Sequence, residues 1–154
     1  MNYMQLREFD TTNGPGVRVS LFVSGCTLHC KGCFNEDSWD FKAGHPMTEE
    51  VEARIVELVN RPYISGLSVL GGDPFEKENI EPVMRLLQRV KAACPGKTVW
   101  VWTGRKYEHF EDHPVMQYID TLVDGPYIEK LKVKEQGQYF GSTNQRVITI
   151  HPVK

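Results

Sequence analysis

Strand-like and helix-like segments alternate along this chain, and this alternation limits the folds that it can adopt. Apolar residues recur at every second position over 17–25, as in a strand. In 48–60 and 77–94 they recur three and four positions apart, as on one face of a helix. Further strands are expected over 65–72, 95–104, 118–125 and 146–150, and a weaker helical segment over 105–118. Such alternation predicts an α/β fold with a mainly parallel sheet and right-handed crossovers.

Each of the first four predicted strands ends in a short run of small or polar residues. These runs are SGC (24–26), GGDP (71–74), WTG (102–104) and VDG (123–125). In parallel α/β sheets, ligands bind beyond the carboxyl ends of the strands. We therefore expect all four runs to face one pocket, although they lie far apart in the sequence.

Length and charge exclude several classes of function. The 154 residues predict one domain over 1–154, and the formal net charge of −2 gives no basic field for binding nucleic acid or a membrane. The longest apolar runs are strand-sized, and the first ten residues lack the apolar core of a signal peptide. We therefore expect a cytoplasmic protein, and in that reducing compartment clustered cysteines indicate metal binding or catalysis.

Cys26, Cys30 and Cys33 follow the first strand with the spacing C-x3-C-x2-C. A zinc site would need a fourth ligand, and the candidates are the adjacent His29 and the distant His45. A thiol-redox pair of Cys30 and Cys33 would leave Cys26 without a role. A four-iron cluster held by three thiolates would keep one iron open for a substrate. This third interpretation explains both the number of cysteines and their place at the ligand edge.

Other chemically capable side chains have simpler interpretations. Cys94 stands alone at the end of a predicted helix, where we expect a small packed residue. Trp100 and Trp102 share one face of their strand and are expected to pack against helices. Solvated surface positions are expected for Arg105, Lys106, His109, His113 and His151.

The two motifs together resemble the signature of the radical S-adenosylmethionine superfamily. Cys26, Cys30 and Cys33 match its C-x3-C-x2-C motif residue for residue. The run Gly71–Pro74 is similar to the Gly-Gly-Glu-Pro element that follows the second strand, with Asp in place of Glu. The resemblance implies a partial, incomplete β/α barrel of the radical S-adenosylmethionine type.

Within that superfamily the chain resembles the activating proteins of anaerobic (class III) ribonucleotide reductases, and nearly the whole chain is covered. The matching runs are NGPG (13–16), LFVSGC (21–26), GCFN (32–35), GGDP (71–74), VWVWTG (99–104), LVDG (122–125) and a GS-NQ element over 141–145. The resemblance implies an oxidoreductase that reductively cleaves S-adenosylmethionine. It would thereby generate the glycyl radical of the reductase.

The resemblance also implies roles for individual residues. Cys26, Cys30 and Cys33 would hold a [4Fe-4S] cluster, whose open iron chelates the amino and carboxylate groups of S-adenosylmethionine. The other expected cofactor contacts are Gly32, Phe34, Gly71, Gly72, Asp73, Thr103, Asp124 and Asn144. Ser142 and Gln145 join Asn144 as candidate contacts to the ribose or the carboxylate.

The resemblance implies specific contacts for the GGDP turn and for the residues around the last cysteine. Gly71 and Gly72 would let the backbone approach the methionine part, and Asp73 or a nearby carbonyl would accept from the ammonium group. The wider superfamily often has an aromatic residue just before the last cysteine, close to the adenine. Here Gly32 occupies that place and Phe34 follows the cysteine, a shift that the activases share, usually with Tyr.

The expected partners follow from the same resemblance. They are the large subunit of the anaerobic ribonucleotide reductase, through its glycyl-radical loop, and a low-potential electron donor such as flavodoxin or ferredoxin. Two alternatives stay open: an activase of another glycyl-radical enzyme, such as pyruvate formate-lyase, and a non-catalytic metal-binding adaptor. The activases of pyruvate formate-lyase are longer chains, which argues against the first alternative.

Overall fold

The computed structural model describes residues 1–33, 36–134 and 139–151. Its strands are β1 (Asn2–Asp10), β2 (Arg18–Val23), β3 (His45–Pro46), β4 (Gly66–Gly71), β5 (Thr98–Trp102), β6 (Thr121–Asp124) and β7 (Arg146–Thr149). Its helices are α1 (Glu49–Val59) and α2 (Ile80–Ala93), with single 3-10 turns η1 (Glu36–Ser38), η2 (Tyr107–His109), η3 (Pro114–Tyr118) and η4 (Glu129–Leu131). Among these residues, no helix combines the length and apolar character that crossing a membrane requires.

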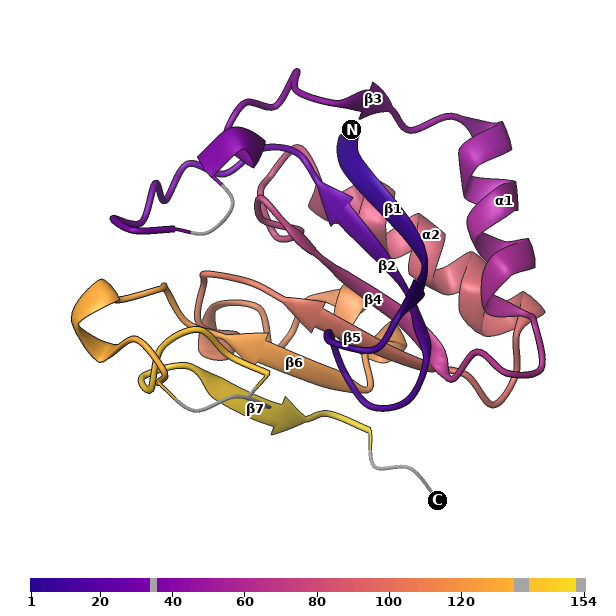
Figure 1. The fold of residues 1–154 in the computed structure, drawn as a ribbon. Helices are drawn as coiled ribbons and strands as arrows, with labels where there is room; N and C mark the ends of the chain where they lie inside the picture. The colour runs from indigo at the N-terminus through magenta and orange to yellow at the C-terminus, as the bar shows by residue number, and fades with distance from the viewer. Residues whose placement is uncertain (34–35, 135–138, 152–154) are drawn as a thin grey trace.

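The described strands form one seven-stranded sheet in the order β3-β1-β2-β4-β5-β6-β7 (Figure 1). The four central strands, β2, β4, β5 and β6, run parallel to one another, as predicted. β1 and β3 extend the sheet on one side and β7 on the other, all in antiparallel pairings. The fold is therefore mixed α/β. The more specific expectation of a partial barrel stays a prediction, because strand pairing defines the sheet and not its closure.

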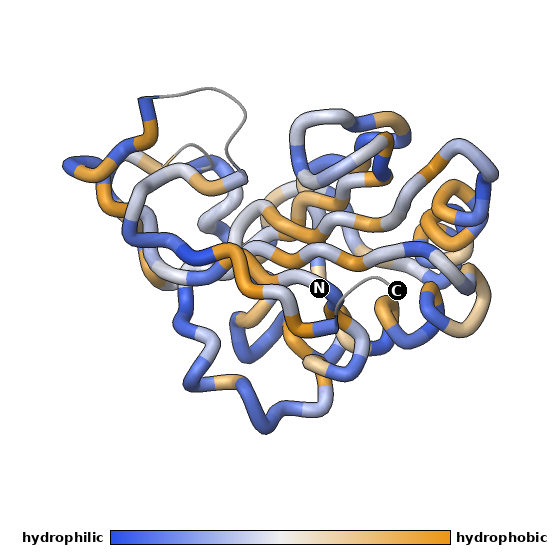
Figure 2. The backbone as a smooth tube through the Cα atoms, turned by 90° about the horizontal axis from the view of Figure 1, so that it is seen from below, coloured by the Kyte–Doolittle hydropathy of each residue, from blue (hydrophilic) through white to orange (hydrophobic). Residues whose placement is uncertain are grey.

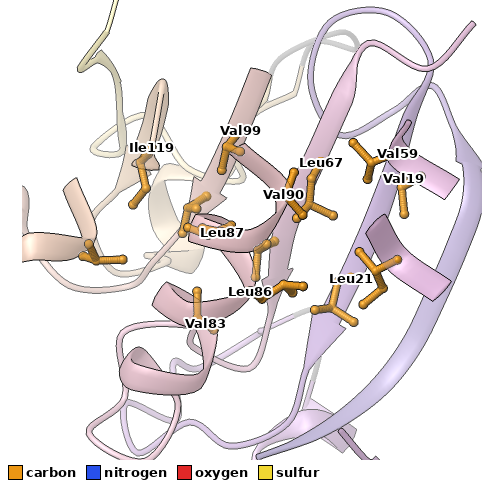
Figure 3. Close-up of a cluster of buried hydrophobic side chains, with 14 of the residues drawn as sticks. Val19, Leu21, Val59, Leu67, Val83, Leu86, Leu87, Val90, Val99 and Ile119 are labelled. Atoms are coloured by element: carbon orange, nitrogen blue, oxygen red, sulfur yellow. The ribbon is translucent and has the colours of Figure 1, made fainter. Parts of the chain in front are cut away.

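Both helices pack on the same face of the sheet (Figure 3). Helix α1 begins where predicted, because the Thr48 side chain accepts a hydrogen bond from the Val51 amide at 3.2 Å. The shared core combines helix residues with alternate strand residues, including Ile55, Leu58, Leu86, Leu87, Leu21, Leu67, Val69 and Val99. Hydrophobic residues accordingly concentrate in the central strands and helices, while the surrounding loops are largely hydrophilic (Figure 2).

The two tryptophans of β5 lie on the other face of the sheet, so the expectation that they pack against helices is wrong. Val99 and Val101 occupy the helix-facing positions, and the strand period of two turns Trp100 and Trp102 away. The Trp100 ring contacts the Tyr139 ring edge-on at 5.0 Å between centroids, and Trp102 Nε1 donates to the Tyr139 carbonyl at 2.6 Å. The segment after β6 therefore covers this part of the sheet.

Two further elements differ from the sequence expectation. The predicted helical segment over 105–118 contains only the turns η2 and η3, because Pro114 lacks the amide that a continuous helix would need. Strand β1 was not expected, because most of its residues are exposed or half-buried and give no apolar alternation. It belongs to the sheet through its pairing with β2.

Arg18 lies on β2 between the alternating apolar residues, yet it is fully buried. Its guanidinium donates to the Ser68 hydroxyl at 2.8 Å, the Thr98 carbonyl at 2.8 Å and the Pro15 carbonyl at 3.2 Å. Burial lowers the pKa of Arg18 to about 10, an effect that Asp120 partly opposes. The residue thus ties the NGPG turn to β4 and β5 with five hydrogen bonds to uncharged groups.

Substituting Arg18→Met should lower the free energy of unfolding by about 3 kcal/mol. The apolar replacement leaves several buried acceptors without donors, each at a cost of roughly 1–3 kcal/mol. Urea unfolding of the purified chain measures the change. The matched control is Arg54→Met, which removes two exposed ion pairs and should cost less than about 1 kcal/mol. Equal effects of the two substitutions would contradict the role given to Arg18.

Candidate functional site

A cavity of about 400 Å³ lies at the carboxyl ends of the parallel strands. Its wall brings together parts of all four strand-end runs: Cys26, Gly71, Gly72, Asp73, Trp102, Thr103, Gly104 and Gly125. Cys30 and Cys33 line the same cavity. The predicted convergence of these runs on one pocket is confirmed. In Figure 1 the cysteine segment after β2 and the turn η4 both extend beyond the left-hand ends of these strands.

The three cysteines line the same cavity but are not arranged as ligands of a single metal ion. Cys26 is buried, whereas Cys30 and Cys33 are half-buried. Within the part of the chain that the structure describes, no three His, Cys, Asp or Glu side chains are grouped as ligands of one metal ion. A cubane cluster binds each thiolate to a different iron, so it does not need such a grouping. The soft thiolate set on one wall therefore fits an iron–sulfur cluster better than a single zinc ion.

The histidines considered as zinc ligands have other contacts. The His29 ring stacks on Trp39 at 4.3 Å between centroids, and its backbone adopts a left-handed φ of 48°. His45 is exposed on β3, with its ring 5.7 Å from that of Tyr3. The Trp39 carbonyl also accepts from the Cys26 amide at 3.1 Å. Trp39 thus supports the cysteine segment from two sides.

Gly71 and Gly72 let the end of β4 lie against the end of β2. Gly71 has a φ of 113°, and a Cβ there would lie 2.6 Å from the backbone nitrogen and oxygen of Val23. A Cβ on Gly72 would lie 2.5 Å from the Gly25 carbonyl oxygen. Two backbone hydrogen bonds of 2.8 Å, from Gly72 to Val23 and from Asp73 to Gly25, complete the junction. Both glycines are therefore required by the protein itself, whether or not a cofactor also approaches them.

Asp73 is fully buried and joins the GGDP turn to the end of β5. One carboxylate oxygen accepts from the Thr103 hydroxyl at 2.7 Å and from the Phe75 amide at 2.9 Å. The other accepts from the Gly104 amide at 3.0 Å and from Arg105 at 2.9 Å. Burial raises the pKa of Asp73, while these donors oppose the increase. The described contacts of Asp73 thus hold protein segments together.

Arg105 was expected at the solvated surface, and this expectation is wrong. Its side chain is 22% exposed and pairs with Asp73 and Glu76, each at 2.9 Å. Burial raises the pKa of Glu76, but donation from Thr27 and Arg105 outweighs it and lowers the pKa below its usual value. Sequence reasoning also missed Glu76. Their positions in the sequence could have indicated both residues, because Arg105 directly follows WTG and Glu76 comes two residues after GGDP.

Asn79 is a third missed residue, and α2 starts directly after it, at Ile80 instead of 77. It is buried, and its side-chain amide donates to the Ser24 carbonyl at 2.9 Å and the Asp73 carbonyl at 3.0 Å. The side chain therefore ties the two motifs together instead of capping α2.

Asp124 and Asn144 lie beside the cavity rather than on its wall. Asp124 accepts from the Tyr107 amide at 2.8 Å and from Arg146 Nε at 3.0 Å. Asn144 donates to the Pro126 carbonyl at 2.8 Å. Both line a neighbouring hollow. Their assignment as cofactor contacts stays a prediction.

The remaining candidates of the GS-NQ element and the cysteine segment are placed as follows. Gln145 lines the cavity. Its side-chain oxygen Oε1 accepts from the backbone amides of Gly141 at 2.7 Å and Ser142 at 3.1 Å. Gly32 faces Glu129, because a Cβ there would lie 2.9 Å from the Glu129 carboxyl carbon. Phe34 lies outside the described residues. Lys106, His109 and His151 are exposed, as expected.

The cavity wall has an aromatic part, lined by Trp102, Tyr127, Tyr139 and Phe140. Of these four residues, the sequence analysis expected only Trp102, in the WTG run, to face the pocket. Cys94 does not belong to this wall. It is fully buried in the core, where its thiol donates to the Val56 carbonyl at 3.5 Å, so its interpretation as a packed residue is confirmed.

Comparison with known proteins agrees with this arrangement. A family model described as "4Fe-4S single cluster domain" matches residues 12–148. A protein of Vibrio cholerae is 42% identical over 149 residues, which cover 94% of this chain and 96% of the relative. One of Escherichia coli K12 is 41% identical over 151 residues (96% and 97%), and one of enterobacteria phage T4 is 38% identical over 147 (96% and 93%). All three are named anaerobic ribonucleoside-triphosphate reductase-activating protein.

The chain belongs to this family. The match with the family model runs from the turn before β2 into β7, so it includes the three cysteines, the GGDP turn and the GS-NQ element. The motif cysteines of this chain thus lie in a domain that is described by its iron–sulfur cluster.

Gly71→Ala should destabilise the protein more than Gly96→Ala. Both glycines have a positive φ, 113° and 86°, so both substitutions carry the conformational cost of about 1–2 kcal/mol. A Cβ on Gly71 also meets β2 backbone, whereas a Cβ on Gly96 meets nothing within 4 Å. We expect an additional loss of at least about 2 kcal/mol for Gly71→Ala in urea unfolding. Equal losses would show that the junction tolerates a side chain.

Asp10 should contribute to stability in a way that acid removes. It holds Thr12 and Asn13 at the cavity by accepting from Thr12 at 2.8 Å and Asn13 at 2.6 Å. Burial raises the pKa of Asp10, but these donors outweigh burial and lower the pKa from 3.8 to about 2. The contribution, about 2 kcal/mol, is present above pH 4 and is lost as the pH falls through about 2.

Comparing the unfolding free energies of the wild type and Asp10→Asn from pH 7 to pH 2 tests this. The difference should be constant above pH 4 and shrink below it. A difference that stays the same down to pH 2 would mean that ionised Asp10 is not the stabilising form.

Proposed function

We propose that this chain reductively cleaves S-adenosylmethionine with a [4Fe-4S] cluster and generates the glycyl radical of the anaerobic ribonucleoside-triphosphate reductase. The observation that carries this proposal is the shared cavity wall of Cys26, Cys30, Cys33 and the GGDP turn. The family model supports the cluster, and the names of the relatives support the reductase as target. The parallel strands support a partial barrel of the radical S-adenosylmethionine type.

In this proposal Cys26, Cys30 and Cys33 would hold the cluster through their thiolates. When bound, the cluster would supply one electron at low potential. The chain positions the substrate and limits its access to water. Asp73 already accepts four donors, so we assign it to holding the ends of β4 and β5. Backbone carbonyls near Gly71 and Gly72 are then the acceptors for the substrate ammonium group.

The aromatic part of the wall is suited to the adenine. Trp102, Tyr127, Tyr139 and Phe140 offer ring faces and edges on which a purine can stack. The cavity volume of about 400 Å³ lies within the range of roughly 300–1,000 Å³ that ligand pockets occupy. We keep Thr103, Gly32 and Gln145 as candidate contacts, together with Phe34, Asp124 and Asn144.

The overall reaction consumes one electron, which a donor such as flavodoxin or ferredoxin supplies. The electron breaks a carbon–sulfur bond of S-adenosylmethionine, which gives methionine and a 5′-deoxyadenosyl radical. That radical takes a hydrogen atom from the α-carbon of a glycine in the reductase, which gives 5′-deoxyadenosine and the glycyl radical. Glycine suits this step, because both flanking amides stabilise its radical and no side chain blocks access. We propose that the reaction occurs in the cytoplasm, within a single domain.

The test is anaerobic reconstitution with iron and sulfide, followed by S-adenosylmethionine and a strong reductant. Chromatography should detect 5′-deoxyadenosine with the wild type and none with Cys30→Ala. The matched control is Cys94→Ala, which removes a buried thiol outside the cavity and should retain both cluster and product. Loss of the cluster in Cys94→Ala would end the three-cysteine proposal.

Two other outcomes would also decide against the proposal. A protein with full iron and sulfide that makes no product, even after the reductase is added, would not be the activase. Zinc without acid-labile sulfide in the purified protein would indicate a non-catalytic metal-binding adaptor. An assay with pyruvate formate-lyase in place of the reductase tests the alternative target.

A further inference from the structure

We propose that Glu76 and Arg105 are positioning residues for Cys26, and that together they tune the stability and potential of the cluster. Neither residue belongs to the C-x3-C-x2-C or GGDP motif. The inference rests on the proposed function, because it assumes that Cys26 is a cluster ligand. Glu76 and Arg105 have no role in either motif, and we expect them to shift the cluster potential in opposite directions.

The first step is the contact between Glu76 and the residue after Cys26. A single oxygen of the Glu76 carboxylate accepts from both the amide and the hydroxyl of Thr27, each at 2.8 Å. The Thr27 amide belongs to the peptide unit that joins it to Cys26. Fixing that amide orients the peptide, and with it the direction in which the Cys26 side chain leaves the backbone.

The second step is the guanidinium that holds Glu76 in place. Arg105 Nη2 lies 2.9 Å from the same Glu76 oxygen and 3.2 Å from the Thr27 hydroxyl. Arg105 Nη1 lies 2.9 Å from Asp73. One side chain therefore links the cysteine segment, the GGDP turn and the residues after β5. Residues that orient metal ligands in this way typically change metal affinity by roughly 10–100-fold when replaced.

The third step is charge. Asp73 and Glu76 are 0% and 5% exposed, so two carboxylates lie buried beside Cys26, and Arg105 is their common cation. Their negative charges lie next to the cysteine segment, since Glu76 contacts Thr27 directly, so they disfavour further negative charge on a cluster held there. Removing Arg105 would strengthen this repulsion, whereas neutralising Glu76 would weaken it. The midpoint potential of the cluster should therefore fall when Arg105 is removed and rise when Glu76 is neutralised.

The experiment uses the full chain, reconstituted anaerobically, as wild type, Glu76→Gln, Arg105→Met and Arg105→Lys. The rate of iron release to a chelator reports how well the cluster is held. A redox titration followed by electron paramagnetic resonance gives its midpoint potential. The matched control is Glu49→Gln, which removes the carboxylate of an exposed ion pair with Arg89, 2.7 Å long, on α1 and α2.

We expect iron to leave Glu76→Gln and Arg105→Met about tenfold faster than the wild type. The potential should rise in Glu76→Gln and fall in Arg105→Met, an opposition that general loosening of the fold would not produce. Arg105→Lys keeps the charge and should restore most of the wild-type potential. Glu49→Gln should match the wild type. Wild-type release rates and potentials in both Glu76→Gln and Arg105→Met would overturn the inference.

Thr27 offers a second test that does not disturb the buried ion pairs. It is exposed, so the chain should fold with Thr27→Ser or Thr27→Ala. Thr27→Ser keeps the hydroxyl and should hold iron like the wild type, whereas Thr27→Ala should release it faster. Equal release from both would contradict the part of the link that the Thr27 hydroxyl makes, whereas the amide part is tested by Glu76→Gln. If Cys30→Ala also kept a wild-type cluster, the proposed function would fail instead, so the two failures are distinguishable.

Discussion

The backbone junction between the ends of β2 and β4 is the contact on which the site depends. Two hydrogen bonds, from Gly72 to Val23 and from Asp73 to Gly25, bring the GGDP turn against the start of the cysteine segment. Atoms this close leave no room for a Cβ on Gly71 or Gly72. Without the junction the three cysteines and the GGDP turn would not share a cavity wall. The two motifs therefore form one structural unit.

Buried polar groups then give that unit a defined geometry. Asp73, Glu76 and Asn79 are each at most 5% exposed, and each accepts from or donates to a different segment. A buried charge without a partner is costly, so the arrangement is stable only when its donors and acceptors are all in place. The positive charge of Arg105 offsets the cost of burying the carboxylates of Asp73 and Glu76 together. The same groups stand next to the residues proposed to bind the cluster.

Elements with local causes could be predicted from the sequence. The helix predicted over 48–60 is present as α1, and Thr48 caps it, because capping depends on neighbouring residues alone. The four parallel strands and the meeting of their carboxyl ends follow from alternation and crossover rules. Strand β1 could not be predicted, because it is held by pairing with β2 and has little buried surface of its own. Trp102 was misplaced for a related reason: the period of two says that it shares a face with Trp100, but not what covers that face.

The chemistry available here can be read from the amino-acid order alone: three thiols at C-x3-C-x2-C spacing, a glycine-rich turn, and strands that deliver both to one edge. These are properties of residue type and local order, which do not depend on distant partners. The identity of the polar side chains at that edge depends on the three-dimensional fold. Arg105 lies near the cysteines, and Asp124 beside the cavity, because of contacts with residues far away in the chain. Pairings of that kind depend on how the segments pack, and no local pattern encodes them.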